Sequence, residues 1–274
     1  MQKYQYHTAM RTFTILSLLF ITLSSFAGTP KIQRYEKIDN ARYKAVYNLS
    51  FIEDTVKRKI NSGYTILLIG DSCSAYSTVN KANLDSACYT LWKAGASQDQ
   101  IAMQAFKYAM GAIESPAVYR GYPSQNEVTI DQYLIENSRY SEPIATQEWT
   151  ETGLTKDIKG LECRQAICSF RGRDYVAYYS PEIPLSFGPY LFGGLPGLIV
   201  ELSDGNSEFV WTIDSFEPSM GFPIVLDNNK VKVMTRDEFR TTDYKLHLQP
   251  GLRFPFDKSM MSMPSKPHNP IEKY

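Results

Sequence analysis

Two arginines flank a glycine in the second half of the chain, and their side chains could bind an anion. The string Phe170-Arg171-Gly172-Arg173 lies between two stretches of strand composition, so it predicts a hairpin with Arg171 and Arg173 at its tip. A guanidinium offers paired N–H donors that match a carboxylate or a phosphate. The alternatives are that both arginines are solvated turn residues, or that one forms a salt bridge with Glu182.

A segment rich in proline and glycine, residues 181–197, follows this turn. Proline cannot donate to a sheet ladder, so the segment cannot be an interior strand. Its large apolar side chains must be buried, which makes it either a plug of the core or the wall of an apolar groove. We expect a groove of this kind to take a hydrophobic or peptide ligand. The candidate ligand-binding residues are Arg171, Arg173, Phe187, Tyr190, Phe192 and Leu195.

A serine at the end of an apolar stretch could act as a nucleophile. Leu68-Ile69-Gly70-Asp71-Ser72 resembles the first block of a GDSL-type esterase, in which a histidine activates the serine. That family places its aspartate and histidine three residues apart, whereas Asp243 and His247 are four apart. A turn after a strand is therefore favoured over a hydrolase site at Ser72. No complete set of acid, base and nucleophile can be placed, so we predict neither a catalytic residue nor a cofactor.

Four cysteines follow the first 27 residues, and an even number in an exported chain indicates two disulfides. Three pairings are possible, of which we favour the local ones, Cys73–Cys88 and Cys163–Cys168. A zinc site needs closer cysteine spacing and nearby histidines, so we predict no metal centre. One alternative is Cu(I), which the soft side chains of Met260, Met261, Met263 and His268 could bind.

Residues 1–27 have the pattern of a secretory signal peptide. Lys3 and Arg11 are basic, Thr12–Thr22 is apolar, and Ser25-Phe26-Ala27 is a small-x-small cleavage site. The apolar run is shorter than the ~20 residues of a transmembrane helix, and no second run is long enough. We therefore expect that the mature chain has no transmembrane span and that it is located in the periplasm. Secretion beyond the outer membrane is an alternative. The net charge of zero argues against nucleic-acid binding.

The elements that must position these residues are mostly strands. Alternation of apolar and polar residues predicts a strand over Tyr43–Phe51, and Asn61-Ser62-Gly63 predicts a turn into a strand over Tyr64–Ile69. A capping box at Ser97 and Gln100 predicts a helix whose apolar stripe runs from Ile101 to Ala112. Further strands are expected at 128–133, 146–150, 161–170, 175–179, 198–202, 209–213 and 231–234.

This order of elements predicts an α+β fold. We expect a mainly antiparallel, curved sheet, with a half-barrel as one form of it, and one or two packing helices. Residues 28–274 would form a single domain, in which 257–274 is an extended C-terminal tail.

The proline- and glycine-rich segment also carries a family resemblance. Gly194-Leu195-Pro196-Gly197-Leu198-Ile199 is the signature of the GLPGLI family, and Gly188-Pro189 precedes it in the family's order. Gln147-Glu148-Trp149 and the C-terminal Asn269-Pro270-Ile271-Glu272 resemble further family segments. The resemblance implies an exported, soluble envelope protein of Bacteroidota-type bacteria, sometimes encoded beside TonB-dependent transporters. It implies no activity, cofactor or catalytic residue.

The sequence therefore predicts a non-catalytic binding or accessory factor of the cell envelope. An alternative is a docking protein whose partner is an outer-membrane transporter or another envelope protein. A further alternative is a hydrolase that uses Ser72.

Overall fold

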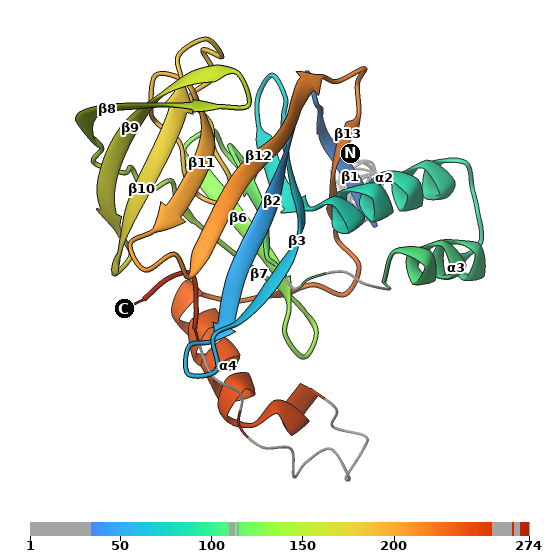
Figure 1. Ribbon diagram of the computed structural model, residues 1–274. Coiled ribbons are helices and arrows are strands. Elements are labelled where there is room, and N and C mark those ends of the chain that lie inside the picture. Colours follow the sequence, from blue (N-terminus) through green and yellow to red (C-terminus); the bar gives the residue numbers. More distant parts are fainter. Residues whose placement is uncertain (1–33, 110–112, 114, 254–264, 266–268, 274) are drawn as a thin grey trace, which may run out of the picture. The chain divides into compact units, whose positions relative to one another are not determined.

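A twelve-stranded sheet dominates the structure, which is a computed structural model that describes residues 34–109, 113, 115–253, 265 and 269–273 (Figure 1). The chain from Tyr35 onward forms one compact unit, to which all the elements below belong. The strands are β1 (Tyr35–Asn40), β2 (Tyr43–Asp54), β3 (Lys59–Ile69), β4 (Ser74–Thr78), β5 (Ala117–Arg120), β6 (Glu127–Tyr133), β7 (Asn137–Pro143), β8 (Thr150–Ile158), β9 (Leu161–Phe170), β10 (Arg173–Ser180), β11 (Leu198–Asp204), β12 (Phe209–Pro218), β13 (Pro223–Asp227) and β14 (Lys232–Val233). The helices are α2 (Val79–Lys93), α3 (Gln98–Ala109), α4 (Arg236–Leu248) and the short 3-10 helix η1 (Pro250–Arg253).

The strand order of the large sheet is β14-β7-β6-β5-β4-β3-β2-β12-β11-β10-β9-β8. Every neighbouring pair is antiparallel except β14 and β7, and β1 pairs with β13 in a separate two-stranded sheet. The sheet is not closed into a barrel. The expected α+β fold with a mainly antiparallel sheet is thus confirmed, but the described residues hold three α-helices rather than one or two.

Strand β2 follows its sequence pattern closely. Ala45, Tyr47 and Leu49 alternate with half-buried residues and are themselves buried, as period-2 alternation predicts. The turn predicted at Asn61-Ser62-Gly63 is wrong, because these residues lie inside β3 opposite β2. The chain turns earlier, where the Asp54 carboxylate accepts hydrogen bonds from the amides of Val56 and Lys57.

Gly63 is a glycine inside a strand because the side chain of Ile113 occupies the space that a Cβ would need. A Cβ on Gly63 would lie 2.8 Å from the side chain of Ile113, which packs over this position. A glycine inside a strand often marks such a close approach rather than a turn.

The capping box at Ser97 is confirmed. Ser97 Oγ accepts from the Gln100 amide at 3.3 Å, and Gln100 Oε1 accepts from the Ser97 amide at 2.8 Å. Ile101 is buried at the start of the predicted stripe, whereas Ala112 lies outside the described residues. Helix α3 lies beside α2 (Figure 1). Neither α2 nor α4 was predicted from the sequence.

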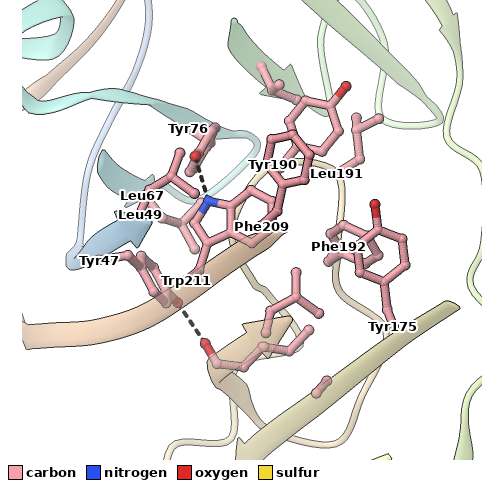
Figure 2. Close-up of a cluster of buried hydrophobic side chains, with 14 of the residues drawn as sticks. Tyr47, Leu49, Leu67, Tyr76, Tyr175, Tyr190, Leu191, Phe192, Phe209 and Trp211 are labelled. Carbon is pink, nitrogen blue, oxygen red and sulfur yellow. Dashed lines mark hydrogen bonds between the residues drawn. The ribbon is translucent and has the colours of Figure 1, made fainter. Parts of the chain in front are cut away.

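The proline- and glycine-rich segment is a plug of the core. Tyr190, Phe192 and Leu195 are buried, and the ring of Phe192 lies 4.5 Å from that of Tyr175, centroid to centroid. Figure 2 shows these rings in the same buried cluster as Trp211, whose indole N–H donates to the Tyr76 hydroxyl at 2.8 Å. The plug therefore fills the space between the strands of the curved sheet.

Two glycines of the signature permit this packing. Gly194 has a φ of 87°, in the left-handed region that glycine tolerates best. A Cβ on Gly197 would collide with the main-chain oxygen of Ser180. The Tyr47 hydroxyl, in turn, donates to the main-chain oxygen of Ile199 at 2.7 Å (Figure 2). Six residues of the expected structural motif are buried, Gly188, Pro189, Leu195, Gly197, Leu198 and Ile199, whereas Gly194 and Pro196 are exposed.

The four cysteines are buried free thiols, so the structure holds neither of the favoured disulfides. Cys163 and Cys168 lie on the same strand, β9, and five residues of strand span about 16 Å. A disulfide needs Cα atoms about 4.4–6.8 Å apart, so this local pairing is wrong. Cys73 precedes β4 and Cys88 lies in α2, where they pack in different apolar clusters.

Candidate binding site

A cavity of about 520 Å³ opens on the face of the sheet that α4 and the C-terminal residues cover. Strands β2, β3, β6, β7 and β12 contribute residues to its wall, and so do the plug, helix α4 and the chain end. Its volume lies in the range of small-molecule sites, about 300–1,000 Å³. Its lining residues are Leu49, Phe51, Glu53, Asn61, Ser62, Ile113, Ser115, Pro116, Ile130, Gln132, Tyr140, Tyr190, Phe209, Phe239, Arg240, Asp243, His247, Asn269, Pro270, Ile271 and Glu272.

Aromatic side chains from the sheet and from α4 line part of the cavity. Phe51 and Phe209 stack with centroids 6.3 Å apart, and Tyr140 and Phe239 lie 5.0 Å apart. Such rings supply a large apolar contact area for a ligand. Polar side chains of α4 and β3 complete the wall, so the cavity suits a molecule with an apolar body and a polar end.

Helix α4 presents Arg240, Asp243 and His247 to this cavity at helical spacing. Residues three and four apart share one helix face, so a single helix supplies all three polar groups. The Nδ1 atom of His247 lies 2.9 Å from the main-chain oxygen of Asp243. This pairing orients the imidazole ring.

The chain end occupies a slot next to the cavity. We call it the tail slot and define it by five residues whose side chains hydrogen-bond to the segment 269–273: Arg171, Arg173, Tyr175, Tyr190 and Arg236. In it, the Glu272 carboxylate accepts from Arg171 Nη1 at 2.6 Å, from the Tyr190 hydroxyl at 2.6 Å and from Arg236 Nη2 at 2.5 Å. Burial raises the pKa of Glu272, but Arg171, Tyr190 and Arg236 outweigh it and hold that pKa below its ordinary value. Glu272 is therefore bound as a carboxylate.

The preceding residues of the tail are held mainly by their backbone. Arg173 Nη2 donates to the Asn269 side chain at 2.5 Å and to the Pro270 main-chain oxygen at 2.7 Å. The Tyr175 hydroxyl donates to the main-chain oxygen of Ile271 at 3.0 Å. These described residues of the expected extended tail, 269–273, are thus docked on the sheet.

The predicted hairpin at Arg171 and Arg173 is confirmed, since β9 and β10 pair directly across it. Both arginines bind carboxylates, as their chemistry suggested, but the carboxylates belong to this chain. Arg171 Nη2 donates to Glu142 at 2.6 Å, and Arg173 Nη1 donates to Asp204 and Glu208, each at 2.7 Å. The alternative partner, Glu182, instead accepts from the amide of Glu162.

The apolar candidates separate into two groups. Tyr190 lines the cavity, whereas Phe187, Phe192 and Leu195 do not and pack in the core. The cavity therefore does not run along the plug, where the groove was predicted. The cavity adjoins the plug at Tyr190 alone.

Ser72 lies in a turn far from this cavity. Its hydroxyl donates to Asp39 Oδ2 at 2.9 Å, and its amide donates to the same oxygen at 2.8 Å. Burial raises the pKa of Asp39, but hydrogen bonds from Ser72 and Asn40 outweigh it and lower that pKa. Asp39 is thus a poor proton acceptor at neutral pH.

The histidine of the esterase comparison, His247, lines the cavity together with Ser62. Ser62 and Ile69 are seven residues apart on β3, a span of about 23 Å, and Ser72 lies beyond Ile69. The structure brings Ser72 and His247 to opposite ends of β3.

A second cavity of about 350 Å³ lies beside α2. Its wall includes Lys81 and Asp85, paired at 2.5 Å, and Asp131, which Arg139 binds at 2.6 Å. These charges are satisfied within the protein. In the described part of the chain, moreover, no group of three or more His, Cys, Asp or Glu side chains could hold a metal ion. The Cu(I) candidates Met260, Met261, Met263 and His268 lie outside the described residues.

Sequence reasoning missed the contributions of α4 and Glu272. The signal for α4 was present, because Thr235 and Glu238 form a capping box like that of α3. The role of Glu272 had no local signal. Its partners Arg171, Tyr190 and Arg236 are 101, 82 and 36 residues away in the sequence.

A family model matches part of the chain. Residues 124–201 match a family model described as "Protein of unknown function (Porph_ging)". The matched stretch includes both arginines of the hairpin and the whole signature segment up to Ile199. None of the curated proteins matches the chain.

Two solved structures are similar to it, those of PNGF-II in space groups P21 and C2. Their sequence identities are 17% and 18%, and the TM-score is 0.49 for each. Each alignment covers 75% of this chain and 33% of the other, so this chain spans about a third of PNGF-II. Among the helices that the structure describes, none has the length and apolar character needed to cross a membrane.

Proposed function

We propose that this protein is a non-catalytic binding protein that holds an amphipathic ligand in the cavity between the sheet, α4 and the docked tail. The observation that supports it is the lining of the cavity, with aromatic rings on the sheet side and Arg240, Asp243 and His247 on α4. Such a site binds the apolar body of a ligand by burial and orients its polar end.

Export to the periplasm and membership of the GLPGLI family belong to the same proposal. They are supported by the signal-peptide pattern of residues 1–27 and by the signature at Gly194–Ile199. The family resemblance also implies a role beside an outer-membrane transporter, which is part of this proposal. The ligand would then be a hydrophobic or peptide molecule of the envelope.

A titration with the environment-sensitive dye 1-anilinonaphthalene-8-sulfonate tests the cavity. The dye has an aromatic body and an anionic end, so we expect saturable binding with a rise in fluorescence. The double variant Asn61→Phe/Ser62→Phe places two rings in the cavity wall, and we expect it to weaken binding at least tenfold. The control is Lys59→Phe/Ile60→Phe, at exposed positions of the same strand that do not line the cavity.

Two results would overturn the proposal. One is a folded chain that shows no saturable dye binding. The other is equal binding by the Asn61→Phe/Ser62→Phe variant and its control. Native mass spectrometry of the protein purified from its own host would then identify any retained ligand by its added mass.

A further inference from the structure

The tail slot contacts a short stretch of chain as a receptor contacts a peptide. All of the slot's bonds to the tail go to residues 269–273. Four of these bonds go to side chains, one to the Asn269 amide and three to the Glu272 carboxylate. The others go to main-chain atoms of Pro270, Ile271 and Lys273, whose amide donates to the Arg171 oxygen at 2.8 Å.

The slot also has a hydrophobic contact point. Ile271 packs against the main core cluster, while Pro270 and Ile271 both line the neighbouring cavity. The segment thus presents an amide, a proline, an aliphatic side chain and a carboxylate in order. Short extended peptides are commonly bound in this way, by main-chain hydrogen bonds together with specific contacts to side chains.

The arginines of the slot also bind carboxylates that do not belong to the tail. Arg173 is bound by Asp204 and Glu208, all three buried. Arg171 is bound by Glu142 at 2.6 Å, and Arg236 lies 3.6 Å from the same carboxylate. Because these acidic residues fix the guanidinium groups, the slot does not depend on the tail for its shape.

Among the residues that the structure describes, Glu142 and Glu272 are the carboxylates paired with Arg171 and Arg236, so without Glu272 the two positive charges share one carboxylate. A peptide without an acidic side chain at this position would leave one of these charges buried and uncompensated. Such a group is costly in a protein interior. The slot therefore selects for a carboxylate, whichever chain supplies it.

We propose that the tail slot is a peptide-binding site selective for the pattern Asn-Pro-aliphatic-Glu, and that it accepts this segment from a second copy of the chain as well as from its own. The cis segment is covalently linked to its own slot, which raises its effective concentration there above that of a dilute free peptide. In an intact chain the tail therefore outcompetes micromolar free peptide. Weakening or cutting the cis segment opens the slot to a partner.

The first experiment uses the full chain with a specific protease site inserted after Met260. The probe is a fluorescently labelled peptide of residues 265–274, followed by anisotropy before and after cleavage and removal of the cut tail. We expect saturable binding to the cut chain, at least tenfold tighter than to the intact one. A peptide with Gln in place of Glu272 should bind at least tenfold more weakly than the original.

Binding that is absent from the cut, folded chain, or equal for the two peptides, would overturn the proposal. If the chain unfolds once its tail is removed, excess labelled peptide is added to the cut chain with the tail still present. Incorporation of the label supports the proposal, and absence of exchange contradicts it.

The second experiment tests a second copy as the partner. A Glu272→Gln chain has an intact slot and a weakened tail, whereas a Tyr190→Phe/Arg236→Gln chain has a weakened slot and an intact tail. By sedimentation velocity, we expect their mixture to form a one-to-one complex larger than either variant alone. Two folded variants that sediment independently at about 100 µM would restrict the slot to its own tail.

Discussion

The tail slot and the cavity beside it share residues but differ in how their space is used. Glu272, Pro270 and Ile271 belong to both regions. In the slot each charged group meets a partner within hydrogen-bond distance, and the chain itself fills the space. The cavity has an aromatic wall and about 520 Å³ that no described side chain fills.

Because the slot is filled and the cavity is open, we expect the slot to contribute to folding stability and the cavity to ligand binding. Buried ion pairs are costly to break singly, because the remaining charge loses its partner in a medium of low dielectric constant. An open cavity contributes little packing, so its wall tolerates change. We expect substitutions in the slot to reduce folding stability and substitutions in the cavity wall to reduce ligand binding.

The largest effect is expected for Arg173→Met. This change leaves Asp204 and Glu208 buried without their cation, and we expect the free energy of unfolding to fall by about 3–5 kcal/mol. Urea denaturation followed by circular dichroism measures it. The control is Arg42→Met, which breaks an ion pair with side chains 64% and 70% exposed and should cost less than about 1 kcal/mol. An equal loss of unfolding free energy in the two variants would contradict the idea that the buried ion pairs of the slot contribute more to stability than an exposed one.

A smaller effect is expected for Glu272→Gln. The variant keeps the shape of the side chain but loses charge-assisted hydrogen bonds, which we expect to cost about 1–3 kcal/mol. Hydrogen exchange of the Lys273 amide should accelerate, because its bond to the Arg171 oxygen depends on a docked tail. Glu148→Gln, at an exposed position, serves as the control. Unchanged exchange at Lys273 would show that Glu272 does not hold the tail.

The docking of the tail should depend on pH. The pKa of Glu272 is lowered in the folded chain, because the donors Arg171, Tyr190 and Arg236 outweigh its burial; Glu142 and Tyr140 also face this cluster. A lowered carboxyl pKa stabilises the fold above the unfolded value and loses that effect as the pH falls through the folded value. We therefore expect slow exchange at Lys273 from pH 7 to 5 and faster exchange relative to its intrinsic rate below about pH 4. The Glu272→Gln chain should lack this transition, and its presence there would assign it to another group.

The smallest effect on stability is expected for Asn61→Phe/Ser62→Phe. Both residues lie at the cavity wall on a partly exposed end of β3, so we expect the free energy of unfolding to change by less than about 1 kcal/mol. The measurement is the same urea denaturation. A cost close to that of Arg173→Met would mean that the cavity wall is a packed part of the core.

Local patterns in the sequence were sufficient for several of the strands and for one helix, but they missed β1, β4, β5, β7 and β13, and the strand expected at 146–150 begins only at Thr150. The alternation over Tyr43–Phe51 and the capping box at Ser97 depend on neighbours within a few residues, and both are confirmed. The error at Asn61–Gly63 arose because a glycine in a strand and a glycine in a turn look alike in sequence. Only the packing of Ile113 over Gly63 distinguishes them.

The candidate site was only partly predictable. The chemistry of Arg171 and Arg173 was evident from their type and their place at a hairpin tip, and they do bind carboxylates. The aromatic residues of the plug could be recognised as buried. That Tyr190 faces the cavity while Phe192 faces the core depends on which strands lie around the plug.

The sequence by itself thus determined the mainly antiparallel sheet, the hairpin with its two arginines, and a proline- and glycine-rich segment that is not an interior strand. These features depend on side-chain periodicity and on backbone preferences, which act over a few residues. The tertiary structure decided which carboxylates the arginines bind, that Cys163 and Cys168 are too far apart to pair, and where space is left for a ligand. These outcomes depend on contacts between residues up to about a hundred positions apart, and no local pattern encodes them.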